Sequence, residues 1–330
     1  KLTRITQSEF TATFGLDLSV QKEIARHFQS FEQELFEFND ELNKQGVYLK
    51  KLRQSILQEA IEGKLTADWR ANNSVIKGDP NTDAQALLAQ IQAEKQRLIA
   101  EGKLKKDKPL APISNAEKPF ELPDGWDWVR LGTVCNKITD GFHNTPKKLK
   151  RGGFVYISAS HVKNGFIDWQ SCDFVDEGNH HELSHKAYPQ KGEILIVNIG
   201  AGCGVSAIID VEYEFSFKNV AILKFNQELL INQYLQIYLQ SQRDNIYSDL
   251  TKGGLQPFLS LKVLNNVFFP LPSVSEQKKI IEKVQHLLAQ VDALETELKD
   301  RQVQTEQLMQ AVLAEAFSPS HLTGLNRELA

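Results

Sequence analysis

The sequence predicts an α/β (α+β) fold in which one globular domain with a mixed sheet is flanked by two long helices that pair as an antiparallel coiled coil. Three observations lead to this prediction. Two segments near the ends of the chain repeat each other without a gap. Apolar residues recur in both at coiled-coil spacing, and the region between them changes to short strand-like runs. With 330 residues, the chain is long enough for more than one domain.

The internal repeat aligns residues 19–60 with residues 275–316 at a constant offset of 256, and 13 of the 42 aligned positions are identical. The identities include Gln21/Gln277 and Leu42/Leu298, and both copies run on into a Leu-Thr dipeptide. Two unrelated surface helices would explain the apolar spacing but not the gapless alignment. We infer that one element was duplicated.

Each copy is predicted to be a long helix with one apolar seam. The first seam would consist of Ile24, Phe28, Phe31, Leu35, Phe38, Leu42, Leu49, Leu52 and Ile56, and the second of Ile280, Val284, Leu287, Val291, Leu294, Leu298, Leu308 and Val312. This spacing is typical of a coiled coil, and each helix would be about 60 Å long. A polar gap at Gln45, and another at Arg301 and Thr305, suggests a device that fixes the register. Antiparallel pairing would bury against residues 284–312 the side chains of Phe28, Phe31, Leu35 and Phe38.

The segment after the first helix contains a second amphipathic helix and a linker. The first helix runs into Glu-Gly-Lys, where Gly63 suits a helix C-cap, and the helix predicted over residues 84–101 ends in the same triplet. These triplets resemble half of a nuclease site, but both stand at helix ends without an acidic strand partner, which favours capping. Residues 103–119 form a basic, proline-rich linker.

From about residue 121 to residue 270 the sequence consists of short strand-like runs separated by glycine and asparagine turns. One helix, predicted over residues 231–247, interrupts them. The pattern indicates a globular α/β or α+β domain of about 150 residues.

Composition limits the function classes. Cys135, Cys172 and Cys203 are widely spaced, which is typical of a reduced, cytoplasmic protein. No apolar run reaches the length of about 18 residues that a membrane span needs, so no membrane association is expected. The net charge of −4 argues weakly against a pervasive nucleic-acid surface but allows a local one.

The stretch HELSH at residues 181–185 matches the HExxH signature of zinc peptidases. Gly178 precedes it, Pro189 follows it, and no third ligand stands at zincin spacing, so we expect a surface turn of at most one or two helical turns and no metal site. The run ILIVNIGAGCGVS at residues 194–206 resembles a nucleotide loop. It is followed by strand-like residues, whereas such a loop must open a helix, so a tight hairpin is expected. The sequence contains no P-loop.

The remaining candidate site is a set of cationic and polar residues on predicted loops. Lysine and arginine can neutralise phosphates, while serine, asparagine, glutamine and histidine can reach base edges. On chemistry alone, ordinary solvated loops are the favoured explanation of these residues. The candidate DNA-binding residues are Lys147, Lys148, Lys150, Arg151, Ser158, Ser160, His161, Lys163, Asn164, Lys252 and Gln256.

The order of several motifs resembles the specificity (S) subunit family of type I restriction-modification systems. ELPDGWDWVRLGTVC resembles the entry to a target recognition domain, and ITDGFHNTP, YISASHVKNG, KGEILIVNIGAG, FSFKNVAIL and LTKGGLQPFLSLKVLNNVFFPLPSVSEQKKI resemble its later landmarks. LRQSILQEAIEGKLT and the following helix are similar to the central conserved region of the family. No single motif is diagnostic, but their order and the helix repeat together are specific.

This resemblance implies a non-catalytic DNA sequence-specificity subunit. It would bind one part of a bipartite double-stranded DNA target, scaffold modification (methyltransferase) subunits and, through them, restriction subunits. S-adenosylmethionine, ATP and Mg would be bound by those partner subunits, not by this chain. A coiled-coil scaffold without DNA binding, or a zinc-dependent hydrolase acting through HELSH, are the alternatives.

The resemblance also implies a domain partition. Residues 1–18 would be the tail of a missing or truncated first recognition domain, 19–66 the first conserved helix, 67–120 the second helix and linker, 121–272 the target recognition domain, and 273–330 the second conserved helix with a tail. A full S subunit has two recognition domains. The chain is therefore expected to be either a piece of one or a natural half-length form that forms a homodimer.

Overall fold

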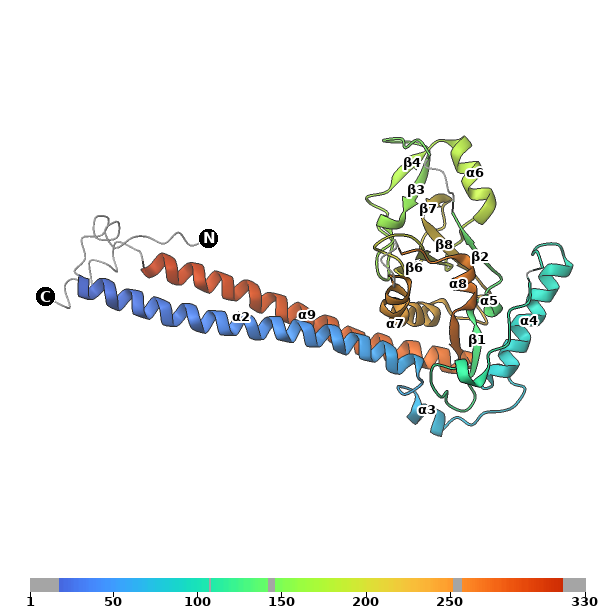
Figure 1. Cartoon of the computed structure of the whole chain (residues 1–330), viewed down its shortest axis with the longest axis horizontal. Coiled ribbons are helices and arrows are strands. Elements are labelled where there is room, and N and C mark those ends of the chain that lie inside the picture. Colours follow the sequence, from blue (N-terminus) through green and yellow to red (C-terminus); the bar gives the residue numbers. More distant parts are fainter. Residues whose placement is uncertain (1–17, 107, 142–145, 252–256, 317–330) are drawn as a thin grey trace. The chain divides into compact units, whose positions relative to one another are not determined.

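The computed structural model describes residues 18–106, 108–141, 146–251 and 257–316 (Figure 1). These residues divide into two compact units: residues 18–53 with 288–316, and residues 54–287. Two long helices, α2 (Leu18–Ile61) and α9 (Val274–Ala316), contribute to both units. Each unit is described by itself.

The two predicted long helices are confirmed, and the start of α9 and the end of α2 lie within one residue of the limits of the internal repeat. Within the first unit they lie side by side and antiparallel (Figure 1). Arg53 forms ion pairs with Asp292 and Glu295, whereas Gly46, one to two turns earlier on α2, approaches the later residue Leu298 on α9. Contacts that move backward on one helix as they move forward on the other define an antiparallel pair.

The seam between these helices repeats every seven residues but differs from the predicted one. Leu35 and Leu42 are buried on α2, and the buried residues of α9 in this unit are Val291, Leu298 and Thr305. Thr305, predicted as part of a polar gap, is therefore inside the seam, and its hydroxyl donates to the carbonyl of Arg301. Seven-residue spacing is the coiled-coil repeat, so the class of packing is as predicted.

Several residues predicted for the seam are exposed instead: Phe38 (46%), Leu52 (45%), Leu294 (47%) and Leu308 (52%). Their neighbours at positions 39, 46, 53, 295 and 302 are half-buried. The side chain of Phe28 lies outside the described residues, and Phe31 is half-buried. The predicted register was therefore wrong by one residue at every second contact layer along the seam.

The second unit contains three sheets. The first pairs β1 (Asp127–Arg130) with β9 (Phe268–Leu271) in antiparallel orientation. The second has the order β2-β8-β5-β6 and is antiparallel throughout; its strands are β2 (Lys137–Asp140), β5 (Ile194–Val197), β6 (Ser206–Ile208) and β8 (Val220–Lys224). The third has the order β4-β3-β7, with β3 (Phe154–Ser158) antiparallel to β4 (Asp173–Val175) and parallel to β7 (Phe215–Lys218). The domain is thus mixed, as expected.

The main core of this unit lies between strands of the second and third sheets. It includes Ile157, Leu195, Phe217 and Ile222, each no more than 3% exposed. Strand β5 is buried at all four positions, which explains its unbroken apolar run. This core fixes the strand ends from which the candidate loops leave.

Helices of the second unit are more numerous than the sequence indicated. The predicted helix is present as α7 (Asn232–Thr251). The structure adds short helices α5 (Leu131–Val134), α6 (Glu177–Ala187) and α8 (Leu261–Asn266), and the 3-10 turns η1 (Asn115–Glu117) and η2 (Ala159–His161). The prediction of a single helix in this region was therefore wrong.

The two Glu-Gly-Lys triplets are helix caps, as predicted. Gly63 after α2 and Gly102 after α4 (Ala84–Ala100) have φ values of +71° and +72°, the left-handed region that favours glycine. The amide after each glycine returns to a carbonyl five residues earlier, on Glu59 and Leu98 respectively. Both helices thus end in the same way. A short helix, α3 (Ala67–Ala71), follows the first cap.

A buried carboxylate joins three segments of the second unit. Glu276, in the first turn of α9, is 3% exposed. It accepts hydrogen bonds from the Thr66 hydroxyl at 2.6 Å and the Trp126 indole at 2.7 Å, and it forms an ion pair with Arg70. The Glu276 carboxylate therefore connects the start of α9 to the segment after α2 and to the residues that lead into β1.

Candidate nucleic-acid interface

The predicted serine–histidine loop begins where β3 ends. His161 is 6% exposed, and both ring nitrogens are used inside the protein. Its Nδ1 accepts from the Ser158 amide at 3.0 Å, so its Nε2 carries the proton and donates to the Ser171 carbonyl at 3.0 Å. The imidazole is therefore placed to hold the loop in shape.

Asp168 extends this arrangement. It accepts from the Ser171 hydroxyl at 2.6 Å, and this hydrogen bond, together with those from the amides of Ser171 and Gln170, holds the pKa of its carboxyl below the ordinary value. Ser171 in turn receives the hydrogen bond from His161. The Asp168 carboxylate thus holds Ser171 in the position where its carbonyl accepts the hydrogen bond from His161.

The exposed polar residues of this loop are Ser160, Lys163 and Asn164. The hydroxyl oxygens of Ser158 and Ser160 are 3.0 Å apart, and the Lys163 ammonium donates to the Ser160 carbonyl at 2.6 Å. These side chains can offer donors and acceptors to a base edge or a phosphate.

The loop continues into a small hairpin whose tip carries an exposed aromatic ring. Val162 and Ile167 pair across it and are buried. The turn is closed by a hydrogen bond from the Lys163 amide to the Phe166 carbonyl at 2.9 Å, and Gly165 has φ +93°. Phe166 is 59% exposed on this constrained backbone. Phe166 was not among the predicted site residues.

Backbone hydrogen bonds bring two further segments to this loop, residues 198–206 and 257–259. The Gly165 amide donates to the Ser206 carbonyl at 3.0 Å, at the start of β6. In the β5–β6 connection, Gly200 donates to the Pro257 carbonyl at 3.0 Å. Leu259 donates to the Asn198 carbonyl at 2.8 Å. We call the combined residues 158–166, 198–206, 218–219 and 257–259 the loop cluster.

The β7–β8 turn joins the loop cluster through sheet register. Lys218 stands opposite Ser158 in the parallel β3–β7 pair, and the Asn198 amide donates to the Asn219 carbonyl at 3.4 Å. Asn219 is exposed with φ +59°, and Arg243 of α7 packs against Gly204. These polar residues were missed, although the Lys-Asn pair between two apolar runs is a turn signal.

The cationic run at residues 147–151 lies along the edge of the same three-stranded sheet. Leu149 bridges Phe174 of β4, and Lys148 forms an ion pair with Asp173 at 2.6 Å. Asp173 stands opposite Tyr156, two residues before Ser158 on β3. Lys147, Lys150 and Arg151 are exposed and have no ion pair among the described residues. The structure thus connects this cationic edge to the loop cluster through one strand.

Two other candidate residues, Lys252 and Gln256, lie outside the described residues. Their flanks are described: Thr251 ends α7, and Pro257 is hydrogen-bonded to the β5–β6 connection. Lys252 and Gln256 remain candidates on the sequence argument alone.

HELSH lies in a helix rather than in the predicted turn. Helix α6 is 11 residues long, and the preceding Asp176 caps it by accepting from the Asn179 amide at 2.8 Å. The helix is anchored by His180, which is fully buried, stacks on Phe154 and lies 2.8 Å from the Ser216 hydroxyl. The motif residue His181 is exposed. Among the described residues, no three His, Cys, Asp or Glu side chains are grouped to hold a metal ion.

The glycine-rich run is a hairpin connection, as predicted. Strands β5 and β6 pair in antiparallel orientation on either side of it, and no helix follows. Its amides at Cys203, Gly204 and Val205 donate to nearby carbonyls. Across the described ranges, helices that combine the length and apolarity of a membrane span were not found.

Comparison with known proteins identifies relatives of this arrangement. The chain is 32% identical over 254 residues to the type I restriction enzyme EcoAI specificity subunit of Escherichia coli, covering 75% of this chain and 41% of the relative. It is 28% identical over 286 residues to the EcoEI specificity subunit of the same organism, covering 82% and 45%. The chain thus spans less than half the length of these two relatives.

A solved structure is also similar. The crystal structure of the HsdS subunit from Thermoanaerobacter tengcongensis aligns with 91% of this chain and 58% of its own, at 18% sequence identity and a TM-score of 0.48. The family profile of the type I restriction modification DNA specificity domain matches residues 123–301, which is more than half of the sequence. The chain therefore belongs to the type I restriction modification DNA specificity domain family.

Proposed function

We propose that this chain is the DNA sequence-specificity component of a type I restriction-modification complex and that it binds one part of a bipartite double-stranded target. The observation that carries the proposal is the loop cluster. Loops from four separate parts of the recognition domain, rich in Ser, Asn and Lys, are tied together by backbone hydrogen bonds at one end of its sheets. A constrained set of donors and acceptors is what direct reading of base edges requires.

The two parts of the site would have different tasks. The exposed cations among residues 147–151 suit the DNA backbone, because phosphate contacts need charge but carry no sequence information. Ser158, Ser160, Lys163 and Asn164 suit base edges. His161 is better suited to holding Ser158 in place than to contacting a base, since both its ring nitrogens are engaged.

Phe166 adds an apolar contact to this set. The major groove admits a two-stranded β-ribbon, and thymine presents a methyl group there that apolar side chains recognise. In the hairpin tip, the exposed Phe166 ring is close in sequence to Lys163 and Asn164, whose side chains suit guanine and adenine respectively. We therefore assign Phe166 to a thymine methyl of the target.

The long helices would bind the modification subunits. Two exposed apolar positions on one face of α2 match two on α9 at the repeat offset, so the same surface occurs twice. We call these residues the outer stripe: Phe38 and Leu52 on α2, and Leu294 and Leu308 on α9, each 45–52% exposed. Apolar stripes on a polar helix pair favour docking of a partner helix. Restriction subunits would join through the modification subunits.

Catalysis would belong to the partners. S-adenosylmethionine, ATP and Mg would be bound by the modification and restriction subunits, and the complex would act in the cytoplasm. A second recognition domain is needed for a bipartite target. It would come from the remainder of a longer chain or from a second copy in a homodimer.

The test is reconstitution with the cognate modification subunit, followed by selection of bound duplexes from a random-sequence DNA pool. We expect one half-site motif to be enriched. The variant Asn164→Ala should lose or relax part of that motif at a cost of about 1–3 kcal/mol. As a matched control, Asn73→Ala changes an exposed asparagine outside the loop cluster and should leave the motif unchanged. Enrichment of no motif, or of the same motif after Ser160, Lys163 and Asn164 are all replaced by alanine, would reject the proposed site.

A further inference from the structure

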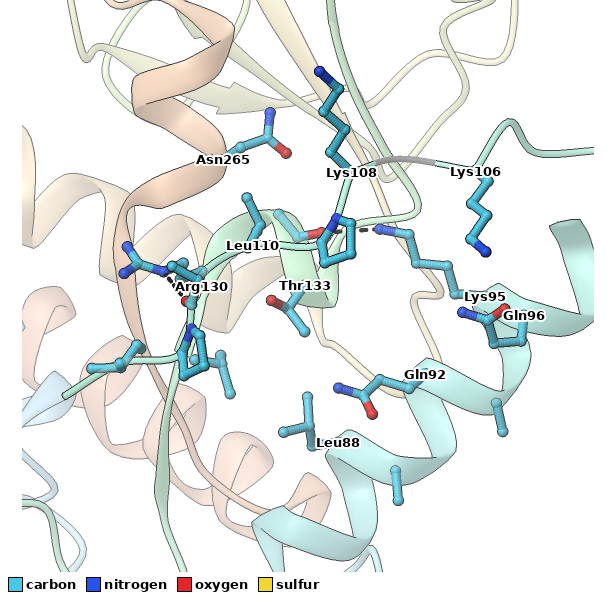
Figure 2. A pocket seen from close by; sticks show the side chains of 18 of the residues that line it. Leu88, Gln92, Lys95, Gln96, Lys106, Lys108, Leu110, Arg130, Thr133 and Asn265 are labelled. Atoms are coloured by element: carbon cyan, nitrogen blue, oxygen red, sulfur yellow. Dashed lines mark hydrogen bonds between the residues drawn. The ribbon is translucent and has the colours of Figure 1, made fainter.

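A groove with a volume of about 720 Å³ lies in the second unit, between α4 and the proline-rich segment that follows it (Figure 2). One wall is a face of α4 that includes Leu88, Gln92 and Ile99. The other is the segment from Lys108 to Ile113, and β1, α5 and Asn265 close the remaining side. Its volume falls within the range of about 300–1,000 Å³ typical of ligand sites.

The groove is held open by the way its walls are attached. Helix α4 buries Ala84, Leu87 and Ile91 elsewhere, which leaves its Leu88 face toward the groove. The opposite wall is fixed because the Arg130 guanidinium donates from Nε to the Ala111 carbonyl at 2.7 Å. Prolines in that wall restrict its backbone.

A lysine ties the helix wall to the floor of the groove. The Lys95 ammonium donates to the carbonyls of Gly132 and Cys135 at 3.0 and 2.8 Å, at the end of α5. Together with the Arg130 contact, this attachment secures both walls without help from a ligand. The groove is therefore preformed, which lowers the entropic cost of binding.

The charge of the groove is one-sided. Among the described residues that line it, four are cations and none is a carboxylate: Lys95, Lys106, Lys108 and Arg130. The chain as a whole has a net charge of −4, so this is a local reversal. Lys95 and Arg130 already donate to backbone carbonyls, and Arg130 also forms an ion pair with Glu117 at 3.6 Å. In contrast, Lys106 and Lys108 are exposed and have no ion pair among the described residues. Such a site attracts anions.

We propose that this groove docks an acidic peptide segment of a partner protein. An apolar side chain of that segment would lie against Leu88 and Leu110, and its carboxylates would approach Lys106 and Lys108. Figure 2 shows amide side chains on both sides, including Gln92 and Asn265, which can bond to a peptide backbone. This docking surface is separate from the loop cluster and does not depend on DNA recognition.

A peptide fits the observations better than nucleic acid does. Phosphates would satisfy the lysines but would leave the apolar wall at Leu88, Ile99 and Leu110 uncovered. An acidic segment with an apolar anchor covers both, and the fixed, proline-containing wall resembles other grooves in which preformed backbone favours peptide binding.

The proposal can be tested with a random peptide library displayed on phage. The library is selected on the immobilised full chain and counter-selected on Ala93→Trp, which fills the groove from an exposed position on α4. We expect recovered peptides to be rich in Asp and Glu around at least one apolar residue. The affinity of a labelled recovered peptide, measured by fluorescence anisotropy, should fall by about tenfold or more in Lys106→Glu/Lys108→Glu and should weaken with salt.

The matched control is Lys77→Glu/Lys118→Glu, which reverses two exposed lysines outside the groove and should change the affinity less than about twofold. Circular dichroism establishes that each variant is folded. Peptides that are neutral or basic, that bind Ala93→Trp equally well, or that ignore the charge reversal at residues 106 and 108 would overturn the proposal. So would random-sequence duplex DNA binding through these two lysines while no peptide is recovered.

Discussion

The seam between α2 and α9 can be tested by placing the same substitution at two leucines of one helix. Leu42 is 1% exposed, whereas Leu52, which the sequence pattern also placed in the seam, is 45% exposed. Leu42→Asp should open the helix pair of the first unit. Leu52→Asp should leave the pair closed and instead weaken binding of the modification subunit through the outer stripe.

The magnitude follows from burial. Removing a fully buried leucine side chain costs about 1.5–3 kcal/mol. Leaving a carboxyl group in its place without partners costs about 1–3 kcal/mol more, whether it is desolvated or protonated. The total loss of at least about 2.5 kcal/mol lowers the ratio of closed to open helix pair by roughly 60-fold or more. At Leu52 about half the side chain is already in water, so the loss should be about 1 kcal/mol or less.

Amide hydrogen exchange read by mass spectrometry is the suitable assay, because it reports opening of the first unit even while the second stays folded. In Leu42→Asp, peptides from residues 18–53 and 288–316 should exchange at least about 60-fold faster, and those from the sheets at the parent rate. Leu35→Asp, at an 8% exposed position, should behave similarly. Parent-like exchange in Leu42→Asp, or faster exchange in Leu52→Asp than in Leu42→Asp, would refute the observed seam.

Four further outcomes are expected. Lys150→Gln should weaken binding of the reconstituted complex to all duplexes alike and lower its salt slope by about one unit, as titrations at several salt concentrations can measure; an unchanged slope would place the backbone elsewhere. Phe166→Ala should lose affinity for the cognate site, and replacing one target thymine by deoxyuridine should weaken the parent but not this variant; additive effects would exclude the methyl contact. Chelator-free protein should hold no stoichiometric zinc by elemental analysis, and one zinc lost in His181→Ala would contradict this. Among the three cysteines, the half-buried Cys172 should react first with a thiol reagent and Cys172→Ser should remove that first reaction, because burial raises the pKa of the Cys135 thiol to about 12 and encloses Cys203; first reaction at Cys135 would contradict the packing.

The sequence predicted the long helices well because their signal is both periodic and duplicated. Helix α9 begins at Val274, one residue before its copy of the repeat, and α2 ends at Ile61, one residue after the other copy. Capping at Gly63 and Gly102 was also predictable, because the residue type itself indicates the left-handed backbone. Sequence patterns were sufficient for these features because helix periodicity and capping depend on residues that are close together in the chain.

The seam register was not predictable from hydrophobicity. In every second layer of the seam, the contact can be made by either of two adjacent rows of residues along α2. The apolar side chains of Phe38 and Leu52 favoured the row that is exposed in the structure. The structure uses the row of Gly46 and Arg53 instead. Gly46 lets Leu298 approach closely, with 3.5 Å to the position of an added Cβ, and Arg53 reaches carboxylates on α9. A glycine and a charged residue are thus seam residues for reasons of shape and pairing.

The candidate site was predicted in its parts but not in its assembly. The polar loop residues could be named from their chemistry, yet their proximity depends on long-range hydrogen bonds such as that from Gly165 to Ser206. Helix α6 was missed because its sequence has little apolar periodicity, and its anchoring depends on the tertiary contacts of His180. Residue type also did not indicate that His161 is buried, with both ring nitrogens bonded inside the protein.

The buried carboxylate of Glu276 has a consequence for how such a protein can change its specificity. Trp126, just before β1, and Glu276, shortly after β9, are hydrogen-bonded to each other, and Thr66 and Arg70 complete the junction. This hydrogen bond thus joins the two ends of the chain segment that runs from Trp126 to Glu276. A foreign segment that begins with the tryptophan and ends with the glutamate would meet Thr66 and Arg70 with the same hydrogen bonds. If the chain reads DNA as proposed, a segment exchanged by recombination could thus bring a new target while Thr66 and Arg70 keep their hydrogen-bonding partners.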